Sequence, residues 1–311
     1  MNKFRSFSNI TISFTYLLIF IGGLVRVSGA GMGCPDWPKC FDRWIPPTNI
    51  EQLPDHIDPA LFNIVLAWIE YCNRLFGAFV GLLITVTMFL ALKHHSSNFK
   101  IKFTVTSAFI LTLVQGWLGS VLVHTVLNPI TITLHLILAL IIVLLLVYGS
   151  QTSYYLQFPN SEKKSNYRSD LKTHFLFLLG ILILEIILGT EIRGGLEMIR
   201  KENPIVDSQF LLDMLGPFKY AHTIFGILIA LISSYLWYHL TIQEKKPSGL
   251  IKVTSTLIVF LVYSQIFLGE ILVFFDVIPL IQLFHLWFAS LIVGLVMIQF
   301  LAWKQSQIVN E

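Results

Sequence analysis

Charged residues are scarce in this chain: Asp, Glu, Lys and Arg make up 13% of its 311 residues. A soluble protein of this length needs far more polar surface, so the composition excludes a soluble globular fold. The motifs of many soluble enzymes are also missing. The sequence contains no Walker loop, dinucleotide-binding fingerprint, nucleophile elbow or zinc-type cluster of Cys and His.

Long hydrophobic runs dominate what is present, with 55% hydrophobic residues and a mean hydropathy of +0.73. Eight runs are long enough to cross about 30 Å of hydrocarbon as helices. The first is followed by no small-residue cleavage site, so we expect a membrane helix there and not a cleaved signal peptide. The sequence therefore predicts an all-α integral membrane protein with eight transmembrane helices. They are expected at 9–29, 64–92, 103–124, 130–150, 173–191, 219–240, 251–274 and 279–303.

The distribution of basic residues predicts the orientation of these helices. The two termini and the loops at 93–102, 151–172 and 241–252 hold 13 of the 21 Lys and Arg residues but only four of the 18 acids. Both termini are therefore expected in the cytoplasm, with the loops at 30–63 and 192–218 outside. The net charge of +3 reflects this bias and gives no reason to expect a nucleic-acid partner.

An internal repeat relates the two halves of the chain. Each half carries the same motifs in the same order, and three of the matches share an offset of 149–150 residues. The matching pairs are YCNRLFG at 71–77 with YAHTIFG at 220–226, GWLGSVLV at 116–123 with IFLGEILV at 266–273, and PITITLH at 129–135 with PLIQLFH at 279–285.

The repeat predicts the domain organisation. Each half contains four spans, an even number, so the two copies have the same orientation and an axis along the membrane normal relates them. We expect two pseudo-symmetric four-helix bundles, at 1–150 and 173–311, joined by a polar linker at 151–172. The loops after the first and fifth spans are either lids over sites in the bundles or solvated connections.

Three histidines lie within predicted spans, where ionisable side chains are costly and usually functional. His135 and His285 occupy the same place in the repeat, about 9 Å from the start of their helices at about 1.5 Å per residue. His222 lies near the outer start of its span, so all three are expected at one depth. A single intramembrane histidine is more often a packing residue, but three at a common depth favour a metal site.

In the C-terminal half, we expect His222 and His285 to face each other across one bundle. Two neutral imidazoles on opposed helices suit the axial positions of haem iron, and an apolar four-helix interior suits a porphyrin. Arg193, at the outer end of its span, is a candidate partner for a haem propionate. Its alternative role is an anchor at the membrane interface.

The N-terminal half differs at the repeat-related positions. His135 has Asn73 as its partner, and asparagine is a poor iron ligand. Glu70 lies three residues before Asn73 on the same helix face, where the other half has Lys219. We therefore expect an open, reactive haem site here and a closed electron-transfer site in the other half. A structural pairing of Glu70 with Arg74 is the alternative.

Other residues near these sites are weaker candidates. Arg26 matches Arg193 and is the propionate candidate of the N-terminal site. His124 is either an exposed loop residue or a substitute ligand. Cys34 and Cys40 lie in the first outer loop, where a disulfide persists, although two free thiols fit the segment too. Their motif CPDWPKC has neither the C-x-x-C spacing of zinc sites nor the C-x-x-C-H motif of covalent haem attachment.

At these residues the sequence resembles the haem A synthase family of respiratory membranes. The resemblance covers essentially the whole chain. One departure is clear, because the family motif commonly reads Glu-x-x-His and this chain has Asn73 at the histidine. The resemblance rests on GGLVRVSGAGMGCPDWPKC at 22–40, EYCNR at 70–74, GWLGS at 116–120, LGTEIR at 188–193 and the histidines 135, 222 and 285.

The resemblance implies oxidation of the C8 methyl group of haem O to a formyl group, which gives haem A for cytochrome oxidase. It implies haem b as a cofactor in the C-terminal half and the substrate haem in the N-terminal half. It also implies Glu70 as the catalytic carboxylate and a Cys34–Cys40 disulfide. We expect an enzyme of the bacterial cytoplasmic membrane, with haem O synthase and a membrane electron acceptor as partners. The alternatives are a b-type electron-transfer protein and a transporter with parallel repeats.

Overall fold

The computed structural model describes residues 3–162, 167–203, 213–275 and 277–310. Within these ranges the protein is all helical, with no strand, and eight helices are long and apolar enough to cross a membrane. The predicted fold class and number of spans are confirmed. The helices are α1 (Lys3–Val27), α2 (Ile64–His94), α3 (Phe99–His124), α4 (Pro129–Gln157), α5 (Leu171–Glu202), α7 (Phe218–Trp237, continued by the π-helical turn Tyr238–Ile242), α8 (Gly249–Phe274) and α9 (Pro279–Asn310).

Polar residues just before the apolar runs fix where several helices begin. The side chains of Asn63, Asn98 and Asn128 accept hydrogen bonds from the first backbone N–H groups of α2, α3 and α4. Such caps satisfy donors that have no partner within the helix. Pro129 starts α4 and Pro279 starts α9, where the missing N–H group of proline costs nothing.

Several helices run past the apolar segments that reveal them in the sequence. α4 continues to Gln157 instead of ending at 150, and α9 continues to Asn310. Polar contacts with other helices lie at this end of α4. Ser150 donates to Asn9 Oδ1 (2.5 Å), and Ser153 lies 3.1 Å from His95 Nε2. Hydropathy detects only the part of a helix that faces hydrocarbon, so it underestimates such ends.

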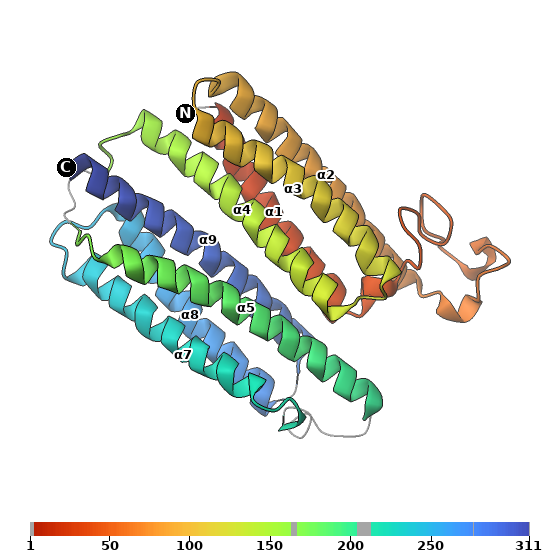
Figure 1. The fold of residues 1–311 in the computed structure, drawn as a ribbon. Helices are drawn as coiled ribbons and strands as arrows, with labels where there is room; N and C mark the ends of the chain where they lie inside the picture. The colour runs from red at the N-terminus through yellow and green to blue at the C-terminus, as the bar shows by residue number, and fades with distance from the viewer. Residues whose placement is uncertain (1–2, 163–166, 204–212, 276, 311) are drawn as a thin grey trace.

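The helices form two groups of four, which Figure 1 shows side by side. α1, α2, α3 and α4 contact one another in a closed ring, and α5, α7, α8 and α9 form a second ring. The rings meet where α4 contacts α5 and α9, and where α1 contacts α9. The two pseudo-symmetric bundles that the sequence repeat predicts, and the axis that relates them, stay a prediction.

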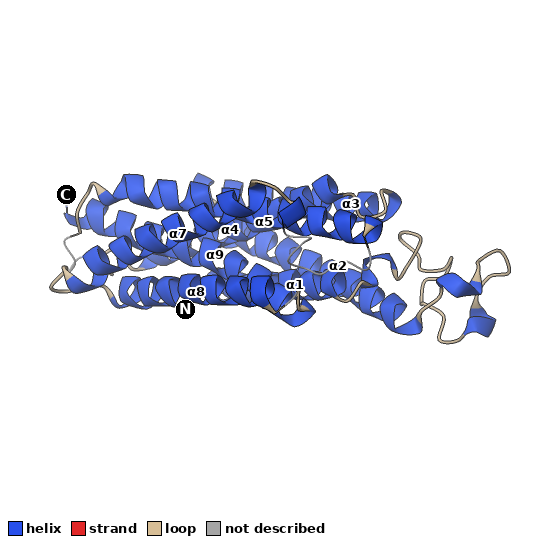
Figure 2. Cartoon of the chain, turned by 90° about the horizontal axis from the view of Figure 1, so that it is seen from below, coloured by secondary structure: helices blue, strands red, loops and turns tan. Residues whose placement is uncertain are grey.

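The two ends of the helix groups differ. The N- and C-termini lie together at one end, which we call the terminal end, as Figure 1 shows. The segment at 28–63 between α1 and α2, which we call the disulfide loop, extends beyond the opposite end, the disulfide end (Figure 2). Many large apolar side chains on the outer faces of the helices are exposed, as expected of a surface that contacts lipid tails. They include Leu82, Leu113, Leu231, Phe103 and Phe260.

A tight contact between α1 and α9 joins the two groups of helices. Trp287 Nε1 donates to the backbone oxygen of Tyr16 (3.0 Å). The Tyr16 hydroxyl lies so close to the Cα of Gly294 that a Cβ there would collide with it. Gly294 therefore lets α1 and α9 approach, and interiors packed this closely tolerate added volume poorly.

We expect Gly294→Ala to lower the stability of the protein by about 1–3 kcal/mol through overpacking. Gly180→Ala is the matched control, because no atom lies within 4 Å of the added Cβ on α5 and alanine favours a helix over glycine. The measurement is the midpoint of thermal unfolding in detergent. Equal midpoints for the two variants would show that the contact between the groups accommodates the added methyl group without loss of stability.

Candidate functional site

His222 on α7 and His285 on α9 face each other within the second ring of helices. The centres of their imidazole rings are 6.3 Å apart. A metal-bound imidazole nitrogen lies about 2.0–2.1 Å from its metal and roughly 1.1 Å from the centre of its own ring, so two imidazoles that share one metal from opposite sides hold their ring centres roughly 6 Å apart. The spacing of this pair therefore suits a single metal ion between them.

Small residues make room around this pair. A Cβ on Gly189 of α5 would lie 3.4 Å from His222 Cε1, and a Cβ on Gly269 of α8 would lie 3.6 Å from His285 Cε1. Gln265, one turn before Gly269, donates from Nε2 to the backbone oxygen of His285 (2.6 Å). His285 is therefore held by its backbone and packed against glycine, while its buried Nδ1 has no hydrogen-bond partner among the described residues.

The first ring of helices holds His135 in the same way. Gln115 on α3 donates to the backbone oxygen of His135 (2.9 Å), and a Cβ on Gly119 would lie 3.9 Å from His135 Cε1. Its Nδ1 is likewise buried without a partner in the described ranges. The repeat that relates 115–135 to 265–285 in sequence is thus reproduced in three-dimensional contacts.

The first ring of helices has more room beside the position that matches His222 than the second ring has. Asn73 on α2 replaces the second histidine, and its Oδ1 is buried with no hydrogen-bond partner in the part of the chain that the structure describes. Gly22, the repeat equivalent of Gly189, has no atom within 4 Å of an added Cβ. A buried amide oxygen without a donor is costly, so a ligand group in this space would satisfy it.

Two half-buried arginines lie near each other at the disulfide end. Arg26 of α1 interacts electrostatically with Arg193 of α5 and with Glu191 and Glu197. The Nε of Arg26 is buried and has no hydrogen-bond acceptor among the residues described, whereas Arg193 donates to Gln282, one turn before His285. Neighbouring buried cations need anions to offset their repulsion. Haem propionates fit this requirement.

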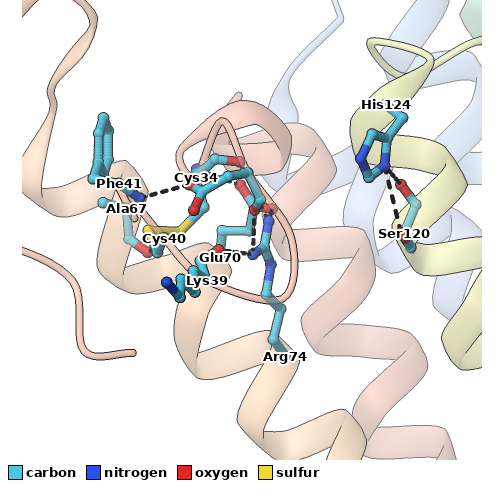
Figure 3. A network of polar contacts seen from close by, with 10 residues as sticks. Cys34, Lys39, Cys40, Phe41, Ala67, Glu70, Arg74, Ser120 and His124 are labelled. Atoms are coloured by element: carbon cyan, nitrogen blue, oxygen red, sulfur yellow. Dashed lines mark hydrogen bonds and ion pairs between the residues drawn. A yellow bond between two sulfur atoms is a disulfide. The ribbon is translucent and has the colours of Figure 1, made fainter. Parts of the chain in front are cut away.

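Cys34 and Cys40 form a disulfide in the structure, and both residues are fully buried. Glu70 of α2 lies directly beneath them: its Oε2 accepts a hydrogen bond from the backbone N–H of Cys34 (2.8 Å), and its Oε1 pairs with Arg74 (Figure 3). A Cβ on Gly33 would collide with the backbone of α2 at Leu66. The loop therefore rests directly on the helix that carries Glu70.

Arg74 fastens the start of the disulfide loop to α2. Its guanidinium donates to the backbone oxygens of Asp36 and Lys39 (both 2.8 Å) and to that of Cys34 (3.3 Å), as well as to Glu70. The pairing of Glu70 with Arg74, one of the two roles open from the sequence, is thus observed. A catalytic role of Glu70 stays a prediction.

His124 lies apart from this cluster, as Figure 3 shows. It is exposed at the end of α3, and its Nδ1 lies 2.8 Å from the backbone oxygen of Ser120 on its own helix. No contact in the described residues connects it to His135, so the structure gives no support to its role as a substitute ligand.

The donor set fits haem better than a bare metal ion. The described residues contain no group of three or more His, Cys, Asp or Glu side chains that could hold a metal. A porphyrin supplies four nitrogens of its own, so its iron needs only one or two axial ligands from the protein. Paired imidazoles in one ring of helices and a single imidazole in the other, each half-buried and packed beside glycine, meet that need.

Comparison with known proteins agrees with this geometry. The family model COX15-CtaA, described as cytochrome oxidase assembly protein, matches residues 5–297. The chain belongs to this family. It is 30% identical over 277 residues to a protein of Shewanella oneidensis named "Heme A synthase", which covers 82% of this chain and 76% of that protein. Similar proteins with the same name occur in Pelagibacter ubique (26% identical, covering 58% of each chain) and Bartonella quintana (28%, covering 64% of this chain and 60% of the relative). The resemblance inferred from the sequence is confirmed at the level of the family.

Three features of this family member could not be assigned from the sequence. Arg74 holds the disulfide loop by donating to three backbone oxygens. Every residue has a backbone oxygen, so the residue types do not reveal this role. Gln115 and Gln265 support the histidine backbones, and only their match in the repeat pointed to them. Oε1 of Glu185 lies 3.0 Å from Nδ1 of His222. Predicting this contact requires knowing how α5 and α7 are rotated about their axes.

We expect Arg74→Gln to loosen the disulfide loop, because a buried carboxylate that loses its cation costs about 3–5 kcal/mol. The measurement is the rate at which Cys34 and Cys40 react with a thiol label in the presence of a mild reductant. A Cys72→Ser background removes the exposed third cysteine. Arg43→Gln is the control, since the Arg43 side chain is exposed and its guanidinium donates a 3.3 Å hydrogen bond to the backbone oxygen of Gln52. Equal labelling rates in the two variants would contradict the role of Arg74.

Proposed function

We propose that this protein is a haem A synthase, which oxidises the C8 methyl group of haem O to a formyl group and yields haem A for cytochrome oxidase. One observation carries the proposal: two repeat-related sites share the same histidine, glutamine and glycine, but only one has a second histidine. A pair of equal sites would suit electron transfer alone. The inequality supports one site for electron transfer and one for chemistry.

In the C-terminal bundle, at 173–311, His222 and His285 are the proposed axial ligands of haem b. When bound, haem b supplies one-electron transfer. Because two imidazoles would hold the group, this site is the proposed electron-transfer site and not the substrate site. Arg193 of α5 donates to Gln282, which lies one turn before His285 on α9. This position supports a role of Arg193 in holding a propionate.

In the N-terminal bundle, at 1–150, His135 is the proposed ligand of the substrate haem. Asn73, at the position that matches His222 in the repeat, would offer only a weakly binding amide, so the bound haem O would be released more readily than from two imidazoles. Arg26 would hold its propionates, given its buried Nε without an acceptor among the described residues. The cytoplasmic linker at 151–172 would join the two bundles.

Oxidising a methyl group to a formyl group with water as the source of oxygen (R–CH3 + H2O → R–CHO + 4 H+ + 4 e−) removes electrons and releases protons, so the site needs acceptors for both. Glu70 is the proposed proton acceptor: it lies one turn from Asn73 on α2, and its carboxylate retains free lone pairs beyond its contacts with Cys34 and Arg74. The Cys34–Cys40 disulfide would fix this carboxylate by fixing the loop that donates to it. The outer side of the bacterial cytoplasmic membrane is the proposed location of the loop, with both termini in the cytoplasm. Haem O synthase and a membrane electron acceptor are the proposed partners.

Co-expression of the full-length protein with a source of haem O tests the proposed function. Haems extracted from the membranes and separated by chromatography should include haem A. The control is a Glu70→Gln variant, for which we expect at least about a tenfold decrease in haem A with b-type haem retained. Bound b-type haem without any haem A in the wild type would contradict the proposal and leave a b-type electron-transfer protein. A colourless protein would favour a transporter.

We expect His222→Leu and His285→Leu each to abolish the bound haem b, because an apolar side chain leaves the iron one axial ligand short. His135→Leu should retain haem b while losing turnover. The measurement is haem b per purified polypeptide. His239→Gln is the control on α7's π-helical continuation, far from the disulfide end, and should retain the full haem content. Retention of haem b in both leucine variants would exclude this pair as ligands.

Asn73→His gives the N-terminal site the second histidine of the other site. We expect the haem spectrum of the protein to gain a second six-coordinate component, because histidine binds haem iron more strongly than asparagine. The measurements are the absorption spectrum and the rate of haem A formation. An unchanged spectrum together with unchanged activity would show that Asn73 has no role near iron.

A further inference from the structure

Glu185 is a second ionisable side chain beside the proposed haem b ligands. It lies in the membrane-crossing part of α5, and its side chain is only 15% exposed. Its Oε1 is 3.0 Å from Nδ1 of His222, and its Oε2 is buried with no hydrogen-bond partner in the described residues. A carboxylate in this environment is costly unless it has a specific partner. His222 is the partner that the structure provides.

Two glycines give α5 and α7 room for the contact between Glu185 and His222. Gly226, one turn after His222, would place a Cβ 3.4 Å from Glu185 Oε1, so the glycine gives the carboxylate room to lie against α7. Gly189, one turn after Glu185, gives the same room to the imidazole. Each helix therefore contributes one functional side chain and one glycine that accommodates the other. The two groups are at contact distance without hydrogen-bond alignment, so forming the bond requires a rotation of the imidazole ring.

The other half of the molecule lacks both members of this pair. The offset of 167 residues that relates Arg26 to Arg193 puts Leu18 at the place of Glu185. The offset of 149 residues that relates the second spans puts Asn73 at the place of His222. The carboxylate is thus present where the second histidine is present and absent where it is absent. A carboxylate with a role only in helix packing would not be expected to occur specifically in the half that has the second histidine.

We propose that Glu185 is a positioning residue that accepts a hydrogen bond from Nδ1–H of His222, directs Nε2 of that ring to haem iron, and holds the haem at a lower reduction potential. The proposal rests on the proposed function, because it assumes haem b at His222 and His285. A metal-ligating histidine commonly donates its other N–H to a carboxylate, which fixes the tautomer and makes the ligand more basic. A more basic ligand next to a negative charge favours ferric over ferrous iron.

The test is a redox titration of the purified full-length protein and its Glu185→Gln variant, followed by the visible haem b spectrum. Glutamine keeps an oxygen acceptor of the same shape but removes the charge. We expect the haem content to be retained and the reduction equilibrium to shift about tenfold toward ferrous haem, which is about +59 mV for one electron. Glu185→Leu, which copies Leu18, should show at least this shift and about a tenfold weaker retention of haem.

Glu270→Gln is the matched control, because it removes another carboxylate from a membrane-crossing helix, α8, where the residue is exposed. Its potential should equal that of the wild type. A Glu185→Gln protein that binds haem through both histidines at the wild-type potential would overturn the role of Glu185 while leaving the proposed function intact. A wild-type protein without haem b would overturn both. If the glutamine variant does not accumulate, Glu185→Asp replaces it, because aspartate retains the charge. A reduction potential of Glu185→Asp closer to that of the wild type than the potential of Glu185→Leu would support the proposal. Equal potentials of Glu185→Asp and Glu185→Leu would overturn it.

Discussion

The structure depends on the pairing of two imidazoles across an apolar bundle. A buried nitrogen that lacks a partner costs free energy, and Nδ1 of His285 has no hydrogen-bond partner among the described residues. A spacing of 6.3 Å between the rings of His222 and His285 suits one metal ion between them. The glycines beside the rings and the glutamine that binds the backbone of His285 are explained by the need to hold this spacing.

The repeat-related site in the other half carries different side chains. His135 keeps its glutamine and glycine, but Asn73 removes the second imidazole and Leu18 stands in place of Glu185. What this half has instead is Glu70, bound to the disulfide loop through Cys34 and Arg74. The two repeat-related sites thus differ at a few residues, and the proposed function assigns electron transfer to one and the substrate to the other.

Much of the fold follows directly from the sequence, because apolar runs define membrane helices and the repeat groups them. The positions of His135, His222 and His285 follow as well, since their depth is set by distance from a helix start. Contacts that depend on how helices are rotated could not be predicted. The pairing of Glu185 with His222 and the closeness of Arg26 to Arg193 belong to this class, as does the loop held by Arg74, because its partners are backbone oxygens.

The most direct test of this account is the low-temperature electron paramagnetic resonance spectrum of the oxidised, purified wild-type protein. Two imidazoles on one iron give a strong ligand field, so the account predicts a low-spin ferric haem signal. Its intensity should correspond to one haem per polypeptide. A spectrum that contains only high-spin ferric haem would contradict the account, because it would show that His222 and His285 do not bind the same iron.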